Sequence, residues 1–571
     1  MSGDHNQETD PGNYQRRTFM ALLSALGVTG LAGCGDDGDG DTPTDTEGGN
    51  GSGNGNGNGD TPTGEPTPTD TSQGTAPPPQ DVTPRSYDRP GDANVVFGQG
   101  VDGFANMTQS PPDIGITEVT DWDLADDGSY MQVVQDTTNI WTRDALGDCH
   151  LHVEWKPPDN AGEADGQNSG NSGIFMMDAY EVQVLNNDNN DTYGGGYAGS
   201  LYLDAPPMVD PARPPTEWQT YDMVWRGPTF NDDDEVVSPA TATVFFNGVC
   251  VLPHINVLGP NFGGVNPYDP HPEEVAVRFQ DHPGISEVQY RNIWYQTTPP
   301  QSATDGVSQF REQYETFEAG TSGAGFISQK FSADFPEGYR VEGEDSDVDY
   351  QPPAVSPGDA PDQQPADGNL SYAPADATTL LEGGDLSGWV ASGGGDPGWS
   401  EEGEYVAVEP GSGNISTEET FADAQVHVEF RIPEDADSPD SGILLADRYE
   451  INIAGSGTSA QGCGAYTGQA APLRDATGAA NEDGWHGMDI VWQGPRFEGG
   501  AVLNRPGRVS VLLNGQVVQD RLYLDGPNAG GEVGNYSPHD AAAPITLQEN
   551  GSPVEFRYVW ARPLYPEEGG R

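Results

Sequence analysis

The chain has little positive charge. Its 571 residues include 91 Asp and Glu but only 23 Lys and Arg, and Lys156 and Lys330 are its only lysines. The formal net charge of −68 opposes binding to nucleic acid or to an anionic membrane surface, so both are excluded as partners. Acidic residues spread along a whole chain are typical of a solvated surface that functions in high salt, where screening weakens their repulsion. We therefore infer a haloarchaeal type of source.

Cysteine is scarce as well. Cys149, Cys250 and Cys463 follow Cys34, and none of them stands in a CxxC or Cys/His spacing that indicates zinc. Cys149 and Cys250 lie in one domain and could form a bridge in an oxidising exterior, which would leave at least one thiol free. We expect no catalytic cysteine.

A long apolar run is missing from the N-terminus. The apolar segment there is Phe19 to Leu31, and its 13 residues are too few to span a bilayer as a mature helix. Arg16 and Arg17 precede it, and Leu-Ala-Gly-Cys34 follows, an order that resembles a twin-arginine (Tat) signal with a lipobox. Residues 1–34 are thus predicted to export the folded chain, with a lipid on Cys34 holding it to the outer face of the cell membrane. A chance cysteine in an unprocessed leader is the alternative.

Apolar residues are also sparse in two further stretches. Residues 35–87 consist mainly of Gly, Asn, Asp, Thr and Pro and cannot bury a core, so we expect a flexible tether. Residues 299–375 are similar, except that Gln309 to Gly343 holds seven aromatic residues and is expected to be partly ordered. The remaining segments, 88–298 and 376–566, are therefore the candidate domains.

Helical periodicity is almost absent from both domains, and short apolar runs separated by turn residues take its place. Asn247-Gly248 between two such runs is a strong hairpin signal. About ten strands in roughly 210 residues fit a two-sheet sandwich, so we expect an all-β fold. The expected strands of the first domain are Val95–Phe97, Tyr130–Val134, Cys149–Trp155, Gly173–Met177, Tyr180–Leu185, Thr220–Trp225, Ala242–Phe246, Val249–Leu252, Val275–Gln280 and Gln289–Tyr295.

The second domain repeats the first. Trp218 and Trp485 are 267 residues apart, as are Asn247 and Asn514. The surrounding sequences agree, since YDMVWRGPTF resembles MDIVWQGPRF and TVFFNG resembles SVLLNG. We therefore expect two tandem copies of one domain.

One strand near the middle of the first domain carries residues capable of chemistry. Three apolar residues, Tyr180, Val182 and Val184, alternate there with Glu181 and Gln183. Such alternation predicts a strand with its apolar side chains toward the core and with the carboxylate and the carboxamide side by side on an open face. That arrangement suits a sugar site, although solvation of an exposed sheet face explains the pattern equally well.

The motifs as an ordered set resemble the 3-keto-disaccharide hydrolase domain family, a relative in fold of the concanavalin A-like lectins and glucanases. The resemblance covers about Arg89 to Thr297 and, less well, about Asp376 to Leu564. It implies two jelly-roll sandwiches in tandem and a sugar substrate, in particular a glycoside oxidised to a ketone at C3. The motifs that carry it are Val95 to Phe104, HVEW at His152, NSGIF at Asn171, YEVQV at Tyr180, Trp218 with Tyr221, Asn247-Gly248, and QDH at Gln280 followed by RNI at Arg291.

The implied chemistry assigns roles to these residues. A ketone at C3 acidifies the C2 proton, so a base can remove it and the C1 substituent can leave, after which water adds. Glu181 is the expected base and Gln183 a hydroxyl partner, while Asp281 and His282 would supply the acid or bind a metal. No cofactor is firmly implied, and a divalent metal is the candidate. Further substrate contacts are expected from Gln280, His152, Glu154 and Arg291.

Several of these residues have structural alternatives. His282 precedes Pro283 and is compatible with an ordinary turn, and a cross-strand ion pair would explain His152 with Glu154. Three function classes stay open: a surface-anchored, monomeric glycoside-processing enzyme, a lectin-like module that binds glycans or a surface protein, and a structural surface protein.

The second copy departs from the first at the expected site. Gln183 is replaced there by Asn452, and His282 by Asn550. We therefore assign catalysis to the first domain.

Overall fold

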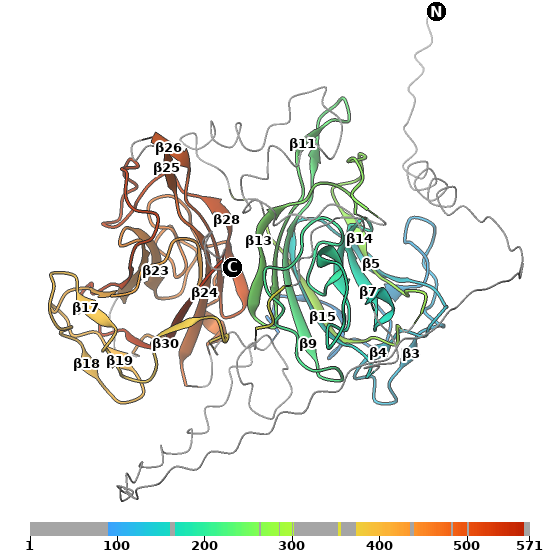
Figure 1. Ribbon diagram of the computed structural model, residues 1–571, viewed down its shortest axis with the longest axis horizontal. Helices are drawn as coiled ribbons and strands as arrows, with labels where there is room; N and C mark the ends of the chain where they lie inside the picture. The colour runs from blue at the N-terminus through green and yellow to red at the C-terminus, as the bar shows by residue number, and fades with distance from the viewer. Residues whose placement is uncertain are drawn as a thin grey trace, which may run out of the picture. The chain divides into compact units, whose positions relative to one another are not determined.

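The computed structural model describes residues 89–159, 166–261, 264–284, 286–299, 301, 352–355, 373–433, 439–480, 483–498 and 502–564 (Figure 1). The expected leader with Cys34, the tether 35–87 and the aromatic segment Gln309 to Gly343 lie outside these residues. The described segments contain no α-helix, and no helix among them is long and apolar enough to cross a membrane.

The first domain is a sandwich of two antiparallel sheets, here called sandwich 1, which runs from blue to green in Figure 1. Its large sheet has eight strands in the order β13-β12-β9-β6-β15-β4-β3, with β1 also paired to β15. Their bounds are β1 Asn94–Phe97, β3 Asp123–Leu124, β4 Met131–Gln132, β6 Cys149–Lys156, β9 Gln219–Arg226, β12 Thr241–Phe246, β13 Val249–Asn256 and β15 Gln289–Thr297.

The small sheet of sandwich 1 has five strands in the order β2-β5-β14-β7-β8. Their bounds are β2 Met107–Thr108, β5 Ile140–Leu146, β7 Ser172–Met176, β8 Tyr180–Val184 and β14 Val275–Phe279. A separate ribbon and two single 3₁₀ turns complete the domain: β10 Thr229–Phe230, β11 Val236–Ser238, η1 Gly166–Asn168 and η2 Gly194–Gly196.

The core of sandwich 1 lies between the two sheets. The predicted inward residues of β8 join this core, and Val182 and Val184 are almost completely buried there. The other face of β8 differs from the prediction of an open surface, because Glu181 is only 3% and Gln183 only 1% exposed. Burial on both faces changes the chemistry of the carboxyl group, since it removes water from around it.

The second domain, sandwich 2, repeats this architecture and runs from yellow to red in Figure 1. Its large sheet follows the order β18-β19-β30-β21-β24-β27-β28, with β16 paired to β30, and its small sheet the order β17-β20-β29-β22-β23. The large-sheet strands are β16 Thr378–Leu381, β18 Ser400–Glu401, β19 Val406–Ala407, β21 Ala424–Arg431, β24 Trp485–Gln493, β27 Arg508–Leu513, β28 Gln516–Tyr523 and β30 Glu555–Pro563. The remaining elements are β17 Trp389–Ala391, β20 Ile415–Thr417, β22 Asp440–Leu445, β23 Tyr449–Ala454, β29 Ile545–Leu547, the ribbon β25 Arg496–Glu498 with β26 Val502–Arg505, and η4 Thr477–Ala479.

The predicted hairpin turn is present in both sandwiches. Asn247 and Gly248 connect β12 to β13 with φ angles of 49° and 79°, and Asn514 and Gly515 connect β27 to β28 with 51° and 72°. Two consecutive left-handed residues form the turn that matches the twist of a hairpin, which is why Asn-Gly is favoured there.

Each of the ten expected segments contains a strand, and the all-β sandwich is confirmed. Strand β5 was not expected, because Arg143 and Asp144 interrupt its alternation. The cysteines Cys149, Cys250 and Cys463 are buried as free thiols, so Cys149 and Cys250 do not form the bridge considered above.

Candidate functional site

Four side chains form a row across the outer face of the small sheet in sandwich 1. Glu181 on β8 is opposite Phe175 on β7, Phe175 is opposite Arg278 on β14, and Arg278 is opposite Trp141 on β5. Their sequence neighbours Ile140, Ile174, Val277 and Phe279 belong to the core, so the row lies on the outer face. We call these four residues the site row.

The guanidinium group of the site row is held in place from two sides. Arg278 Nε donates to Asp178 Oδ1 at 2.6 Å, and Trp141 Nε1 donates to the same oxygen at 3.1 Å. The guanidinium carbon lies 3.6 Å from the centre of the Phe175 ring. Asp178 sits in the turn between β7 and β8 with a left-handed φ of 58°, and this turn directs its carboxylate to β14. A fixed cation therefore stands two strands away from Glu181.

Glu181 is held by backbone as well as side-chain contacts. Its N–H donates to Asn261 Oδ1 at 2.6 Å, and Asn261 Nδ2 donates to its carbonyl oxygen at 3.2 Å. Burial raises the pKa of Glu181 to about 8, and the charge of Arg278 opposes that rise. A carboxyl group with such a pKa can take up or release a proton close to neutral pH.

A glycine makes room for this carboxyl group. Gly173 is opposite Gln183 in the hairpin, and a Cβ atom built on it would lie 2.3 Å from Glu181 Oε1. No real contact is that short, so only glycine allows the carboxyl group to lie against β7.

The side chains beside Glu181 present amide groups. Gln183 lies 2.7 Å from the amide of Gln167, and in the orientation that suits its surroundings it donates to Glu181 Oε1 at 3.2 Å. Gln280 Oε1 and Asn171 Oδ1 are buried acceptors without a hydrogen-bond partner in the described part of the chain. Such acceptors are suited to the hydroxyl groups of a sugar.

Asp281 and His282 follow Gln280 at the end of β14. The Asp281 carboxylate accepts a hydrogen bond from Thr137 Oγ1 at 3.3 Å, and its N–H donates to Asn139 Oδ1 at 2.9 Å. Burial raises the pKa of Asp281 and lowers that of His282. Asp281 and His282 thus directly follow Gln280 in the chain. Asp281 is bound to the segment before β5 and not to Glu181.

The other expected substrate contacts are not brought to Glu181. His152, Glu154 and Arg291 lie on the outer face of the large sheet, on the opposite side of the sandwich. Arg291 Nε forms a cross-strand ion pair with Glu154, as the structural alternative expected. Burial alone would lower the pKa of His152, but the charge and hydrogen bond of Asp222 outweigh it and raise this pKa to about 10.

The surroundings of Glu181 do not fit a divalent metal. The described residues contain no group of three or more His, Cys, Asp or Glu side chains arranged to hold an ion. The nearest charge to Glu181 in the site row is the cation of Arg278, where a metal site would place a further anionic ligand.

In sandwich 2 the corresponding row retains only the acid. Glu450, Leu444, Thr546 and Ser416 occupy the four positions in the same register. Burial raises the pKa of Glu450 to about 6, and Gln548 Nε2 donates to its Oε2 at 3.3 Å. The cation and both aromatic rings are absent from this row.

The 3-keto-alpha-glucoside-1,2-lyase-like domain model matches residues 93–296 and 376–562. The chain belongs to this family. The two matched ranges correspond to the two sandwiches, so the expected family and its tandem repeat are confirmed. No curated protein matches the chain.

Solved structures that match part of this chain include a Parabacteroides distasonis protein named as a glycosyl hydrolase. It is 28% identical, with a TM-score of 0.33, over 38% of this chain and 93% of that one. A carbohydrate binding module from Bacillus subtilis is 11% identical, with a TM-score of 0.19, over 32% of this chain and 98% of that one.

Within this lyase-like family member, three site-row residues escaped the sequence analysis. Phe175 stands inside the NSGIF motif of the resemblance. Arg278 lies two residues before the QDH motif, and its exchange for Thr546 between the copies was a usable signal. Trp141 lies on the unexpected strand β5, so no alternation pattern pointed to it.

Proposed function

We propose that sandwich 1 cleaves 3-keto-glycosides by removing the C2 proton and eliminating the C1 substituent, with water adding afterwards. The observation that carries this proposal is the site row, in which a carboxyl group with a pKa of about 8 shares one sheet face with a fixed guanidinium group. Membership of a lyase-like family supports the reaction class.

Glu181 acts as the general base. Ionised Glu181 takes the C2 proton, and the electron pair of that C–H bond forms the C2–C3 double bond of an enolate. A base with a pKa of about 8 is a better match to a carbon acid than an ordinary carboxylate, because the proton transfer is less unfavourable. Gln183 holds the carboxyl group from the side.

Arg278 stabilises the enolate oxygen through its positive charge. The charge is fixed before substrate arrives, since Asp178 and the Phe175 ring hold the guanidinium group. Preorganised charge of this kind lowers the barrier without reorganisation during the reaction. The enolate then expels the C1 oxygen as the C1–C2 double bond forms, and the leaving oxygen takes a proton from water, whose hydroxide is neutralised by the proton held on Glu181. Water then adds across this double bond, with its hydroxyl group on C1 and its proton on C2, which completes hydrolysis.

A lectin-like role is the second proposal. This role is favoured for sandwich 2, because Thr546 and Ser416 replace the cation and an aromatic ring there, and Gln548 contacts Glu450. Such a row offers hydroxyl and amide groups to a sugar but no fixed charge for an enolate.

The two functions are separated by assaying the full chain in high salt on matched 3-keto and unoxidised disaccharides, with and without chelator. We expect cleavage of the keto sugar alone, with no effect of chelator. Binding of either sugar without cleavage would replace the lyase proposal by the lectin proposal for both sandwiches.

We also propose that the reaction takes place outside the cell, with Cys34 as the lipid anchor. The support is the order of Arg16, Arg17 and Cys34 in the leader. A Cys34→Ala variant should leave the membrane fraction, and one that stays there unmodified would exclude the anchor.

A further inference from the structure

The two sandwiches share residue types on the outer faces of their large sheets but differ on the outer faces of their small sheets. On the small sheets, the site row changes at three of its four positions, as described above. On the large sheets the two copies keep the same residue type at five matching register positions. These pairs are His152 and His427, Glu154 and Glu429, Asp222 and Asp489, Arg291 and Arg557, and Trp294 and Trp560.

The large-sheet outer faces are in contact with each other. Val491 on β24 and Leu512 on β27 belong to the same apolar cluster as the core of sandwich 1. Both point away from the core of sandwich 2, because their neighbours Ile490 and Val511 belong to that core. All described residues lie within one compact unit, Pro84–Arg571.

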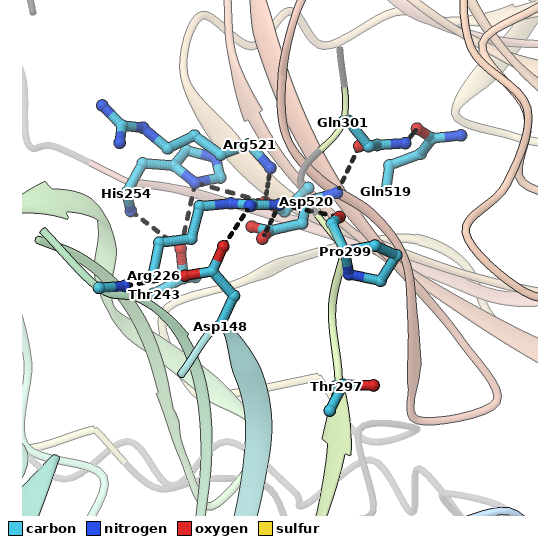
Figure 2. Close-up of polar contacts among 12 residues, drawn as sticks. Asp148, Arg226, Thr243, His254, Thr297, Pro299, Gln301, Gln519, Asp520 and Arg521 are labelled. Atoms are coloured by element: carbon cyan, nitrogen blue, oxygen red, sulfur yellow. Dashed lines mark hydrogen bonds and ion pairs between the residues drawn. The ribbon is translucent and has the colours of Figure 1, made fainter. Parts of the chain in front are cut away.

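A buried ion pair crosses this contact (Figure 2). Arg226, at the end of β9, lies 3.0 Å from Asp148 Oδ2 of its own sandwich and 2.7 Å from Asp520 Oδ2 of the other. The Asp520 side chain is only 4% exposed, and burial raises its pKa against the charge of Arg226. Separating the sandwiches would leave the buried Asp520 carboxylate without this cation, at a large cost in free energy. The ion pair therefore stabilises the contact between the sandwiches.

The end of sandwich 1 and Gln301, which follows it, also bind sandwich 2. Gln301 Oε1 accepts a hydrogen bond from the Asp520 N–H at 2.9 Å, as Figure 2 shows. Arg474 Nη2 donates to the Thr297 carbonyl oxygen at 2.7 Å.

Side chains of sandwich 2 form hydrogen bonds with the backbone of the β12–β13 hairpin. Gln425 Nε2 donates to Gly248 O at 2.9 Å, and Gln425 Oε1 accepts from Cys250 N at 2.9 Å. Arg562 donates to Cys250 O at 3.1 Å. The hairpin edge of one sandwich is thus covered by the other, which protects it from further pairing.

The contacts are reciprocal. Gln296 occupies the position on β15 that Arg562 has on β30, and it donates to Gln516, beside the matching hairpin of sandwich 2, at 3.3 Å.

Two residues at the centre of the contact show the same reciprocity. His254 and Arg521, at equivalent positions, have left-handed φ angles of 52° and 46°. His254 Nδ1 lies 3.4 Å from Ser510 Oγ of sandwich 2. Arg521 Nη2 donates to Asn256 Oδ1 of sandwich 1 at 2.8 Å. Equivalent residues contacting each other's sandwich define an isologous interface, as in a twofold dimer.

We propose that the two sandwiches form a fixed isologous pair, a dimer interface built into one chain, in which sandwich 2 is the resident partner of sandwich 1. This role accounts for the copy differences: both sandwiches need the pairing face, whereas only one needs the site row. It is independent of the reaction proposed for Glu181.

A nicked full-length protein tests the pairing. A protease site is inserted between residues 302 and 351, the purified chain is cleaved, and the products are sized in high salt. We expect the two halves to elute together at the mass of the intact chain. Asp520→Arg should separate them, because it sets two cations against each other in a buried site.

The matched control is Asp423→Arg, which breaks largely buried ion pairs with Arg496 and Arg505 inside sandwich 2. Its halves should still elute together. If Asp520→Arg fails to fold, Gln425→Ala, which removes two hydrogen bonds, should speed separation of the halves by roughly tenfold or more. Separation of the wild-type halves, or equal behaviour of the interface variants and the control, would overturn the proposal.

Discussion

Glu181 is a carboxylic acid whose surroundings keep it largely protonated at neutral pH. Water is excluded from both sides of β8, and the one nearby cation offsets only part of the cost of ionisation. Ionisation therefore coincides with the pH range in which a base for a carbon acid is useful. Its counterpart Glu450, with a pKa of about 6, is ionised earlier and lacks the cation.

The first prediction concerns the base. Glu181→Gln keeps the shape of the side chain and removes the proton acceptor, so turnover of a 3-keto-glycoside should fall by roughly a hundredfold or more. In the wild type, kcat/KM should rise with pH and level off above a pKa of about 8. Glu450→Gln is the matched control and should change neither value. Full turnover by Glu181→Gln would remove this residue from the mechanism.

The second prediction is a pH-dependent gain in stability. The folded pKa of about 8 lies above the ordinary 4.5, so wild-type folding binds a proton between these values and loses stability as pH rises through them. Glu181→Gln does not titrate. Its Tm, relative to that of the wild type, should therefore rise from about pH 5 to about pH 8 and then level off, as thermal melts from about pH 5 to about pH 9 would reveal. A constant difference would contradict the raised pKa.

Sequence reasoning singled out Glu181 as the candidate base but did not predict its environment. Alternation gave the direction of its side chain, because a strand has a period of two. Burial of the outer face depends on Asn261 and on the loop residues around Gln167, which are distant in sequence or irregular in structure. Arg278 was missed for a related reason. Its place in the same row as Glu181 follows from the order of strands β14, β7 and β8 in the sheet, which the sequence does not show.

At the scale of elements, the β7–β8 hairpin positions the site. Its turn carries Asp178, its first strand carries Phe175 and Gly173, and its second carries Glu181. One supersecondary unit thus places the proposed base and the group that holds Arg278.

The third prediction tests the space that this hairpin leaves. Gly173→Ala would put a Cβ atom 2.3 Å from Glu181 Oε1, so the carboxyl group must move. A misplaced base should cost roughly tenfold to a hundredfold in turnover, with a smaller change in KM. Gly442→Ala, which meets Glu450 Cγ at 2.8 Å, is the matched control and should leave turnover unchanged. Equal effects of the two variants would show that the loss comes from folding and not from the site.

Most strands could be predicted, since they are short apolar runs bounded by turn residues. Strand β5 could not, because Arg143 donates to the Met107 carbonyl and Asp144 accepts from Tyr295, so polar partners replace the usual alternation. Asn247-Gly248 was predictable because its turn chemistry is local.

At the scale of the whole molecule, the duplication of the domain could be predicted from the sequence, but the contact between the two sandwiches could not. The repeat is visible as a constant spacing of 267 residues between matching motifs. The pairing depends on single side chains such as Arg226 and Asp520, whose contact joins positions nearly 300 residues apart. His152 and Glu154 were predicted for the sugar site because they share one strand face and belong to the HVEW motif of the resemblance. They lie instead on the large-sheet outer face, where the same residue types recur in both copies.

The most direct test of the account follows the C2 hydrogen of the substrate. The full chain is incubated in high salt with a 3-keto-α-glucoside in deuterated water, and the released sugar is examined by mass spectrometry and NMR. Elimination with Glu181 as base predicts that the product carries deuterium at C2, and that Glu181→Gln lowers cleavage and labelling together while Glu450→Gln lowers neither. Cleavage that leaves the original hydrogen at C2 would mean direct displacement at C1, and it would contradict the proposed reaction.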